Sequence, residues 1–550
     1  MSDRRKVIIV GGVAGGMSAA TRLRRVDETA EIIVLERSGF VSFANCGLPY
    51  HLSGTIEERS SLVLQTPASL GARFELDVRV KNEVIAIDRA SKQVTVIDTV
   101  EGVEYTLPYD YLVLSPGAGA VLPAQPGGER AIPMRDIEDL DRAMAWLYSK
   151  PSSAVVLGGG FIGIEVAENL VKRGMQVSLV QRGPQLLPML DPELAVILQQ
   201  RMSASGVSLH LGQTVATFGK KIVELLDGTE LPADLVFVAS GVSPETALAI
   251  DAGVSLGPHG GILVDEYQRT TDPSIYAVGD VAEKVDAITG ESKIVSLAGL
   301  ANRHGHSVAN HIAGVETVPA TPALGTSIVS FDGLAAAAVG MNEKTANKLG
   351  KSVRIVHTHP ANHAAYYPGA QTMRLKLLVD PETDLIVGAQ GIGGEGVDKR
   401  IDVIATAMFA GITASNLAQL ELSYDPQHGS AKDPINMLGY VNRNIAEGLT
   451  NVAEWHELAD LVAAGTIVVD VRSPGEHKYG HIPGSLNIPV DTLRDHIADL
   501  AGRNVVVYCQ VGQRGHTASR ILSQHNITVR NLNGGYLTWK AGTNAQGAQQ

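Results

Sequence analysis

Two segments of this chain repeat one order of elements, an apolar strand, a glycine-rich turn and a helix. This repeat limits the possible fold more than any other feature. Residues 6–36 read as strand, turn, helix and strand, and residues 153–182 repeat that order. Apolar β-branched runs on both sides of a helix of this length are typical of a βαβ unit. We therefore expect an α/β protein with two Rossmann-like dinucleotide-binding domains.

The first glycine turn is incomplete but is followed by an acid at a suitable distance. Gly11 and Gly16 hold the first and third glycine positions, and Val13 stands in place of the middle one. Glu36 ends the second strand about 20 residues further on, where an acid can bind an adenosine ribose. A pyrophosphate would lie at the helix N-terminus, where free N–H groups favour negative charge. We predict cofactor contacts from Gly11, Gly16, Glu36 and Arg37; the alternative is a glycine-rich turn without a ligand.

The second glycine turn is complete, with Gly158, Gly160 and Gly163 between a strand and a helix. The acid expected at the end of its second strand is absent, and Gln181 and Arg182 stand there instead. An arginine accommodates a 2′-phosphate that an acid would repel, so the sequence favours NADPH over NADH. The alternative is that Arg182 only faces solvent.

Three further segments resemble the pyridine nucleotide-disulfide oxidoreductases over about the first 320 residues. TDPSIYAVGD at 271–280 is similar to the second FAD motif of that family, in which the aspartate, here Asp280, contacts the ribityl chain. SPGA at 115–118 and SGVSP at 240–244 occupy the linker positions. The resemblance implies FAD as a cofactor, and it adds these contacts: Gly117, Gly241, Gly279 and Asp280.

Only two cysteines are present, Cys46 and Cys509, so a disulfide scaffold or a cysteine-based metal site is not expected. Most members of this superfamily carry two nearby cysteines, whereas Cys46 has no local partner. A single thiol can form a mixed disulfide with a small thiol, or a sulfenic acid when the substrate is a peroxide or oxygen. Both chemistries are therefore open for Cys46.

The sequence around Cys46, SFANCGLPY, resembles that of coenzyme A disulfide reductases, as do Tyr366-Tyr367-Pro368-Gly369 and Ser423-Tyr424 with the SAKDPIN that follows. The resemblance implies that Cys46 is the nucleophile. It also implies a homodimer in which Tyr366 and Tyr424 reach into the partner's site as proton donors. The chain departs from the family after Tyr424, where Asp425-Pro426-Gln427-His428 replaces two prolines and an aromatic residue, so the loop carrying Tyr424 differs.

The same resemblance assigns contacts to coenzyme A, and two of them follow a helical spacing. Arg22 and Arg25 are one turn apart, so both side chains can face one anionic ligand. NADH oxidases and peroxidases are the alternative, but they place a histidine in the first glycine loop, where this chain has Val13-Ala14-Gly15. The predicted coenzyme A contacts are Ser18, Arg22, Arg25, Ser42, Asn45 and Lys432.

The C-terminal part of the chain resembles rhodanese domains, through IVVDVRSPGEHKYGHIPGSLNIPV at 467–490 and YCQVGQRG at 508–515. Cys509 follows a strand, and a short loop with Gly512 and Arg514 is predicted to aim backbone N–H groups at the sulfur. Such a loop stabilises a thiolate or a persulfide. Four residues separate Cys509 from Arg514, whereas the related phosphatase loops need five, so a larger phosphate should fit poorly. A rhodanese-like fold used only for binding is the alternative.

At 550 residues the chain is too long for one core. Between the two resemblances, alternating strands and a helix near 399–411 predict an α+β dimerisation domain, and the tail 541–550 is expected to be disordered. The predicted domains are an FAD-binding domain in two parts (1–150 and 266–320), an NAD(P)-binding domain (151–265), the dimerisation domain (321–447) and an α/β rhodanese domain (453–545).

Together the resemblances imply an FAD-dependent NAD(P)H reductase of coenzyme A disulfide, persulfide or related polysulfides, joined to a sulfurtransferase-type domain. A sulfur carrier or sensor is the alternative from another class. The net charge of -13 argues against a nucleic-acid partner. No stretch approaches the ~20 apolar residues of a membrane span. We expect a cytoplasmic homodimer that binds no metal.

Overall fold

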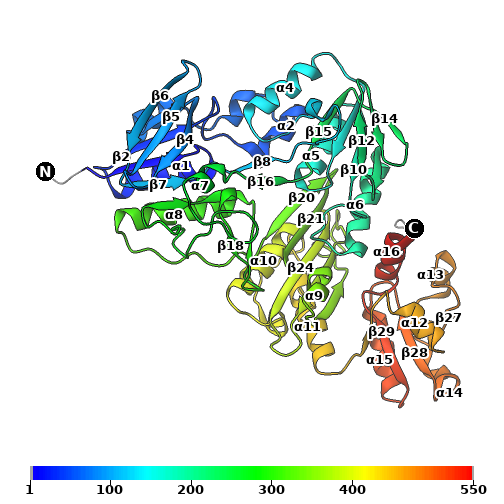
Figure 1. Cartoon of the computed structure of the whole chain (residues 1–550). Helices are drawn as coiled ribbons and strands as arrows, with labels where there is room; N and C mark the ends of the chain where they lie inside the picture. Colours follow the sequence, from blue (N-terminus) through cyan, green and yellow to red (C-terminus); the bar gives the residue numbers. More distant parts are fainter. Residues whose placement is uncertain (1–3, 548–550) are drawn as a thin grey trace. The chain divides into compact units, whose positions relative to one another are not determined.

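The computed structural model describes residues 4–547, which divide into two compact units (Figure 1). The first unit holds residues up to 180 together with 213–325, and the second holds 181–212 together with the chain from 326 onward. No helix within residues 4–547 is long and apolar enough to cross a membrane.

A five-stranded parallel sheet forms the centre of the first unit. Alternate side chains of β1 point to opposite faces, so Val7 and Ile9 join one apolar cluster and Ile8 and Val10 join another. Burial on both faces is typical of a parallel sheet. Its strands, in spatial order, are β17 (Ile275–Ala277), β7 (Tyr111–Leu114), β1 (Lys6–Val10), β2 (Glu31–Glu36) and β3 (Asp77–Val80).

Two helices, α1 (Ala14–Val26) and α8 (Ala298–Ala313), pack against each other on one face of this sheet. An antiparallel sheet contributes to the apolar cluster on the other face. That sheet consists of β4 (Asn82–Asp88), β5 (Gln93–Asp98) and β6 (Val103–Pro108).

The second strand–turn–helix segment also forms the predicted βαβ unit. Strand β9 (Ser153–Leu157) pairs in parallel with β10 (Gln176–Gln181) and with β15 (Leu235–Val238), and α5 (Phe161–Lys172) lies between β9 and β10 in the chain. The remaining strands of the first unit are β8 (Ala118–Ala120) with β16 (Val242–Pro244), β12 (Val215–Phe218) with β13 (Ile222–Leu225) and β14 (Glu230–Pro232), and β18 (Lys284–Val285) with β19 (Ser292–Lys293). Its other α-helices are α2 (Leu48–Leu52), α3 (Pro67–Phe74), α4 (Ile137–Leu147) and α7 (Ala247–Asp251).

The second unit contains a five-stranded antiparallel sheet, as the alternating strands predicted. Helix α10 (Val397–Phe409) follows it near the predicted position, and α11 (Pro434–Ala446) and α9 (Glu343–Lys348) complete this α+β part. Helix α6 (Pro192–Ala204) belongs to the same unit. The strands, in spatial order, are β20 (Ser327–Phe331), β21 (Leu334–Gly340), β24 (Ile386–Gly393), β23 (Arg374–Val379) and β22 (Arg354–Thr358).

A parallel five-stranded sheet forms the C-terminal part of the second unit, coloured orange to red in Figure 1. Its strands, in spatial order, are β25 (Val452–Ala453), β29 (Thr528–Leu532), β28 (Asn504–Tyr508), β26 (Ile467–Asp470) and β27 (Leu486–Asn487). The helices here are α12 (Leu458–Ala463), α13 (Pro474–Tyr479), α14 (Ile497–Leu500), α15 (Gln513–Ser523) and α16 (Gly535–Gly547).

The prediction of a disordered tail is wrong for residues 541–547, which belong to α16. Ala541 and Ala545 lie one turn apart, and both are buried against Val196 of α6. A Cβ atom added at Gly542 would lie 2.3 Å from the Trp455 ring. Small residues therefore let this helix pack closely, whereas the prediction considered only its polar composition. Residues 548–550 lie outside the described part.

Candidate functional site

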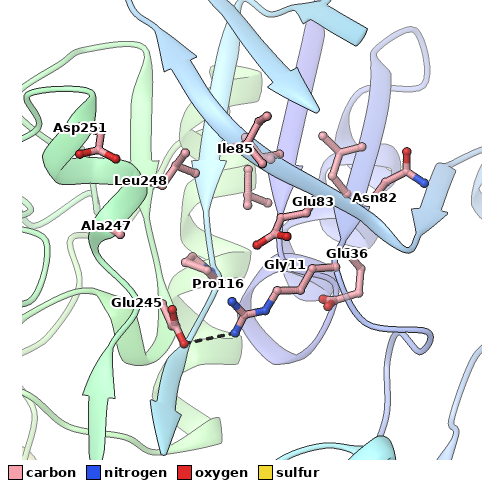
Figure 2. A pocket seen from close by; sticks show the side chains of 14 residues that line it. Gly11, Glu36, Asn82, Glu83, Ile85, Pro116, Glu245, Ala247, Leu248 and Asp251 are labelled. Carbon is pink, nitrogen blue, oxygen red and sulfur yellow. Dashed lines mark hydrogen bonds and ion pairs between the residues drawn. The ribbon is translucent and has the colours of Figure 1, made fainter. Parts of the chain in front are cut away.

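A cavity of about 280 Å³ opens beside the first glycine turn (Figure 2). Gly11, Glu36 and Arg37, all predicted as cofactor contacts, line it. The Glu36 carboxylate accepts hydrogen bonds from the backbone N–H groups of Gly12, at 2.9 Å, and Ser38, at 2.8 Å. These bonds fix an acid at the end of β2, where the ribose of an adenosine would be bound.

Three acids of this cavity, Glu83, Glu245 and Asp251, were not predicted, because they come from distant parts of the chain. Arg37 forms an ion pair with Glu245 at 3.2 Å, drawn as the dashed line in Figure 2. Burial alone would lower the pKa of Arg37, but its hydrogen bond to Glu245 raises it.

Both glycine turns have backbone geometry that excludes a side chain. Gly11 has φ +96°, and a Cβ atom there would lie 2.1 Å from the Ser115 carbonyl oxygen. Gly158 has φ +106°, and its Cβ would lie 2.3 Å from the Ala239 carbonyl oxygen. At Gly160, in contrast, a Cβ would meet nothing within 4 Å. The first glycine of each turn therefore packs closely against a neighbouring strand end, and the second turn leaves open space at its middle glycine, where a dinucleotide pyrophosphate would approach the backbone.

The third glycine of each turn touches the first one. A Cβ atom at Gly16 would lie 2.0 Å from the Gly11 carbonyl oxygen, and one at Gly163 would lie 1.9 Å from that of Gly158.

Arg182 directly follows β10, and its side chain is exposed.

The two linkers predicted from SPGA and SGVSP lie side by side, since β8 and β16 pair with Ala118 opposite Pro244. Gly117 precedes β8, and Gly241 precedes β16. Gly279 and Asp280 begin the short 3-10 helix η4 (Gly279–Val281), which follows β17 at the edge of the parallel sheet.

A buried lysine that the sequence analysis missed lies beside Asp280. The Lys284 ammonium donates to the carbonyl oxygens of Gly279 and, at 2.7 Å, Ala282, so it holds the turn that carries Asp280. Burial raises the pKa of Asp280 and lowers that of Lys284 to about 8. A lone lysine in the run VGDVAEKV was the available signal.

Cys46 lies in the 3-10 helix η1 (Asn45–Gly47), directly before α2, and its side chain is exposed. Its backbone N–H donates to the Asn45 side-chain oxygen at 3.0 Å. Partial burial, followed by the negative charges of Glu165 and Asp280, raises the pKa of the Cys46 thiol. The described residues of the first unit contain no second cysteine.

Glu165 of α5 is a further titratable group near Cys46 that the sequence did not indicate. The Tyr50 hydroxyl donates to its carboxyl group at 3.4 Å. Burial raises the pKa of Glu165 to about 7 and, together with Glu165, that of Tyr50 to about 12. The surroundings of the thiol thus include a carboxyl group that exchanges a proton near neutral pH.

A second cavity in the first unit, of about 610 Å³, is lined by three of the predicted coenzyme A contacts, Ser18, Arg22 and Arg25 of α1. The Ser18 hydroxyl donates to Asn302 and the Arg22 guanidinium to Asn310, both at 2.7 Å. Arg22 and Arg25 therefore face one cavity, as their spacing predicted. Ser42 and Asn45 lie in the segment leading to Cys46 and do not line it.

Helix α8 supplies polar residues of this cavity that the sequence analysis did not select. Their spacing by about four along ANRHGHSVANH was the available signal. Burial, followed by Arg22 and Arg25, lowers the pKa of His306. The α8 residues in the lining are Asn302, Arg303, His304, His306, Ser307 and Asn310.

Arg24, the other arginine of the basic run, has a structural role. Its side chain is buried, and it donates only to backbone carbonyl oxygens. Their residues are Asp27, Glu28, Phe74 and Glu75.

In the second unit, the structure brings Tyr366 and Tyr424 together although 58 positions separate them in the sequence. Their hydroxyl groups lie 3.3 Å apart, and the two residues are 76% and 49% exposed. The hydrogen bond to Tyr424 raises the pKa of Tyr366. In the divergent loop, His428 pairs with Asp425 at 2.7 Å. Lys432 is exposed and follows this loop.

Cys509 is buried at the end of β28, and the Gly512 N–H points at its sulfur at 3.2 Å. Arg514, in the first turn of α15, makes two hydrogen bonds to Glu476, at 2.8 and 2.6 Å. Arg514 lowers the pKa of Glu476 to about 2. Glu476 was not predicted as a site residue, although it completes a capping box with Ser473 at the start of α13.

Comparison with known families agrees with this arrangement. The family of pyridine nucleotide-disulphide oxidoreductases matches residues 5–305, and the dimerisation domain of the same family matches residues 326–433. The rhodanese-like domain matches residues 454–542.

Individual proteins match over most of the chain. A coenzyme A disulfide reductase of Staphylococcus haemolyticus (strain JCSC1435) is 31% identical over 442 residues, which are 80% of this chain and 100% of that protein. Among solved structures, reduced Bacillus anthracis CoADR-RHD has a TM-score of 0.97 at 41% identity and covers 98% of both chains. An NAD-dependent persulfide reductase from A. fulgidus has a TM-score of 0.91 at 34% identity and covers 97% of this chain and 100% of its own.

In chain order, the three family matches cover the two parallel sheets with their glycine turns, the antiparallel sheet and the Cys509 domain. The chain belongs to the pyridine nucleotide-disulphide oxidoreductase family and carries a C-terminal rhodanese-like domain.

Proposed function

We propose that this protein reduces coenzyme A disulfide or coenzyme A persulfide through Cys46, with electrons from NAD(P)H. The observation that carries the proposal is the exposed Cys46 thiol, which has no second cysteine among the described residues of its unit. Such a thiol has no partner in its unit for an internal disulfide, so a mixed disulfide with a small thiol substrate is a route open to it. The relatives named as a coenzyme A disulfide reductase and a persulfide reductase support the choice of substrate.

The first glycine turn, Glu36 and Arg37 would hold the adenosine and pyrophosphate of FAD, with Asp280 at its ribityl chain. The turn from Gly158 to Gly163 would hold the nicotinamide dinucleotide. A bound flavin would supply the transfer of two electrons from the nicotinamide to sulfur. In this electron transfer the protein residues position the cofactors, and Cys46 alone changes oxidation state.

In the proposed reaction, the Cys46 thiolate attacks one sulfur of coenzyme A disulfide. A Cys46–coenzyme A disulfide forms, the substrate S–S bond breaks, and one coenzyme A thiolate leaves and takes up a proton. Two electrons then split the mixed disulfide into a Cys46 thiolate and a second coenzyme A thiol. We propose that Tyr366 and Tyr424 of the partner subunit in a homodimer donate the proton that the leaving coenzyme A thiolate takes up. Both hydroxyl groups are exposed and adjacent.

The Cys509 domain would carry sulfane sulfur as a cysteine persulfide. The Gly512 N–H at 3.2 Å from the sulfur supports this assignment, since it stabilises negative charge there. With thiosulfate as donor, the Cys509 thiolate would take the outer sulfur and release sulfite. Coenzyme A would then accept that sulfur as the persulfide that Cys46 reduces.

Steady-state oxidation of NADPH and NADH tests the proposed reductase directly. We expect rapid turnover with coenzyme A disulfide or persulfide and slow turnover with hydrogen peroxide or oxygen alone. Faster turnover with peroxide or oxygen would overturn the proposal in favour of the oxidase or peroxidase alternative. No sustained turnover with any of these four oxidants would favour a sulfur carrier or sensor.

The cavity beside α1 and α8 fits the phosphate groups of coenzyme A, because Arg22 and Arg25 line it together. We expect Arg22→Ala and Arg25→Ala each to weaken coenzyme A substrates by about ten- to a hundredfold, as losing one charge-assisted contact does. Small polysulfides, which lack these phosphates, should be affected much less. Kinetics with both substrate classes measure this, with Arg4→Ala, an exposed arginine outside the cavity, as control. Equal losses for both classes would give the arginines a structural role.

We further propose a preference for NADPH, set by Arg182. The A. fulgidus protein is named as NAD-dependent, so nicotinamide preference is a point on which the two proteins would differ. The exposed Arg182 side chain directly after β10 supports a role at the 2′-phosphate.

Arg182→Glu is expected to lower the ratio of kcat/KM for NADPH to that for NADH by about ten- to a hundredfold, since a phosphate partner becomes a ribose partner. Arg182→Gln is the matched variant, and it should lower the ratio less because it adds no acid. The ratio is measured for both variants at one ionic strength. An unchanged ratio in both would show that Arg182 does not contact the nucleotide.

A further inference from the structure

Within the second unit, the Cys509 domain meets the antiparallel sheet through buried polar groups. Asn533, which directly follows β29, is 3% exposed and lies at the centre of this boundary. Its side-chain nitrogen donates to the Ile355 carbonyl oxygen of β22 at 3.0 Å and to Glu454 at 2.8 Å. Its side-chain oxygen accepts from the His357 N–H at 3.3 Å. One amide thus joins the edge strand of the sheet to the Cys509 domain.

The turn that follows Asn533 supports the loop of Cys509. A Cβ atom added at Gly535 would lie 2.5 Å from the Cys509 carbonyl oxygen and 2.8 Å from the Gly512 nitrogen, so the two backbones are in close contact. The Tyr536 N–H donates to the Cys509 carbonyl oxygen at 2.8 Å. The Leu537 N–H donates to the Gln510 carbonyl oxygen at 3.1 Å. Residues 533–537 therefore contact β22 on one side and the sulfur-carrying loop on the other.

A second contact reaches the same turn from the antiparallel sheet. His359, directly after β22, lies 2.8 Å from the Thr538 hydroxyl through its Nε2 atom. Thr538 packs against the turn, since a Cβ atom at Gly534 would lie 2.1 Å from its hydroxyl oxygen. The hydrogen bonds of Asn533 to β22 and of Thr538 to His359 therefore hold the turn at both ends.

We propose that Asn533 is a positioning residue, through which the antiparallel sheet sets the geometry of the Cys509 loop and so its reactivity. The inference rests on the proposed sulfur-carrying role of Cys509. It predicts that sulfur transfer at Cys509 depends on contacts that lie outside its own domain.

The partner of Asn533, Glu454, lies at the edge of a buried charged cluster. Lys376 contacts three carboxylates, Asp191 at 2.8 Å, Glu193 at 2.6 Å and Glu343. His357 lies 4.0 Å from Glu454 and 3.7 Å from Glu193. Four acids thus face one lysine in a site where the Glu454 side chain is 13% exposed. One lysine cannot balance four carboxylates, so a protonated Glu454 suits this site best.

Burial raises the pKa of Glu454 from its usual 4.5 to about 8, and Glu343 and Glu193 add to the rise. Burial also keeps His357 neutral by lowering its pKa. Because the pKa of Glu454 is raised on folding, its stabilising contribution is complete below about pH 4.5 and is lost as the pH rises through about 8. The hydrogen bond from Asn533 acts in the opposite direction, because it favours the ionised carboxylate and so lowers the pKa of Glu454.

The test uses the full chain, with thiosulfate as sulfur donor and cyanide as acceptor. Asn533→Asp keeps the size of the side chain but removes both donated hydrogen bonds. His359→Gln alters the contact between His359 and the Thr538 hydroxyl. We expect sulfur transfer to fall about ten- to a hundredfold in Asn533→Asp and less in His359→Gln, as small displacements of reacting groups do. Oxidation of NAD(P)H by coenzyme A disulfide, which uses Cys46, should stay unchanged. Asn504→Ala, at an exposed asparagine of the same domain, is the control.

One further measurement separates positioning from a loss of stability. Alkylation of Cys509 by iodoacetamide, followed by mass spectrometry, should be severalfold faster in folded Asn533→Asp, because the buried loop is less firmly held.

Wild-type rates of both sulfur transfer and alkylation in Asn533→Asp and His359→Gln would overturn the inference. If the wild type transfers no sulfur, the proposed role of Cys509 fails. The alkylation rates then still decide whether Asn533 positions the loop.

Discussion

Replacement of Cys46 by serine should abolish reduction of coenzyme A disulfide by NAD(P)H, with a loss of roughly a thousandfold or more in kcat, as expected when a covalent nucleophile is removed. A serine hydroxyl is not ionised at neutral pH and forms no disulfide with coenzyme A. The first unit offers no other cysteine among its described residues. Consumption of NAD(P)H with coenzyme A disulfide measures the loss.

The matched control is Cys509→Ser, which removes the other cysteine and should leave this reaction at the wild-type rate. Cys46→Ser should also remain yellow, since the residues that would hold the flavin are unchanged. A Cys46→Ser rate within tenfold of the wild type would show that electrons reach the substrate without this thiol.

Cys509→Ser should instead stop the reaction that starts from thiosulfate with catalytic coenzyme A, again by roughly a thousandfold or more. In the proposed sequence, Cys509 takes up sulfane sulfur and passes it to coenzyme A, and Cys46 reduces the resulting persulfide. Reduction of preformed coenzyme A persulfide should therefore continue at the wild-type rate. Release of sulfide, measured together with NAD(P)H consumption, should likewise stop when thiosulfate is the donor and continue with preformed coenzyme A persulfide.

Cys46→Ser is the complementary variant here, and it should lose both the thiosulfate-driven and the preformed-persulfide reaction. A Cys509→Ser variant that keeps the thiosulfate-driven reaction at full rate would contradict coupling of the two thiols. The rhodanese-like domain would then serve a different acceptor.

The parts of the fold that follow local rules could be predicted from the sequence. The strand–turn–helix segments predicted both parallel sheets of the nucleotide folds, because glycines at Gly11 and Gly158 mark turns that no other residue can make. The helical spacing of Arg22 and Arg25 was enough to place both in one cavity. Alternating strands similarly predicted the antiparallel sheet of the second unit.

Contacts between distant segments were missed for a physical reason. Glu165 of α5 lies near Cys46, and Glu245, which follows β16, pairs with Arg37, only because the fold brings segments far apart in the sequence together. Glu476 belongs to a recognisable capping box, but its pairing with Arg514 depends on how two helices of one domain meet. The helix at residues 541–547 was missed because small residues that pack closely have the composition of a disordered tail.

The central claim is that Cys46 forms a mixed disulfide with coenzyme A, and mass spectrometry of the protein tests it most directly. Protein treated with coenzyme A disulfide, digested and analysed without reductant, should carry one coenzyme A on the peptide that contains Cys46. Addition of NAD(P)H should remove that mass. A Cys46 that stays unmodified under these conditions, yet turns over with peroxide as a sulfenic acid, would contradict the claim.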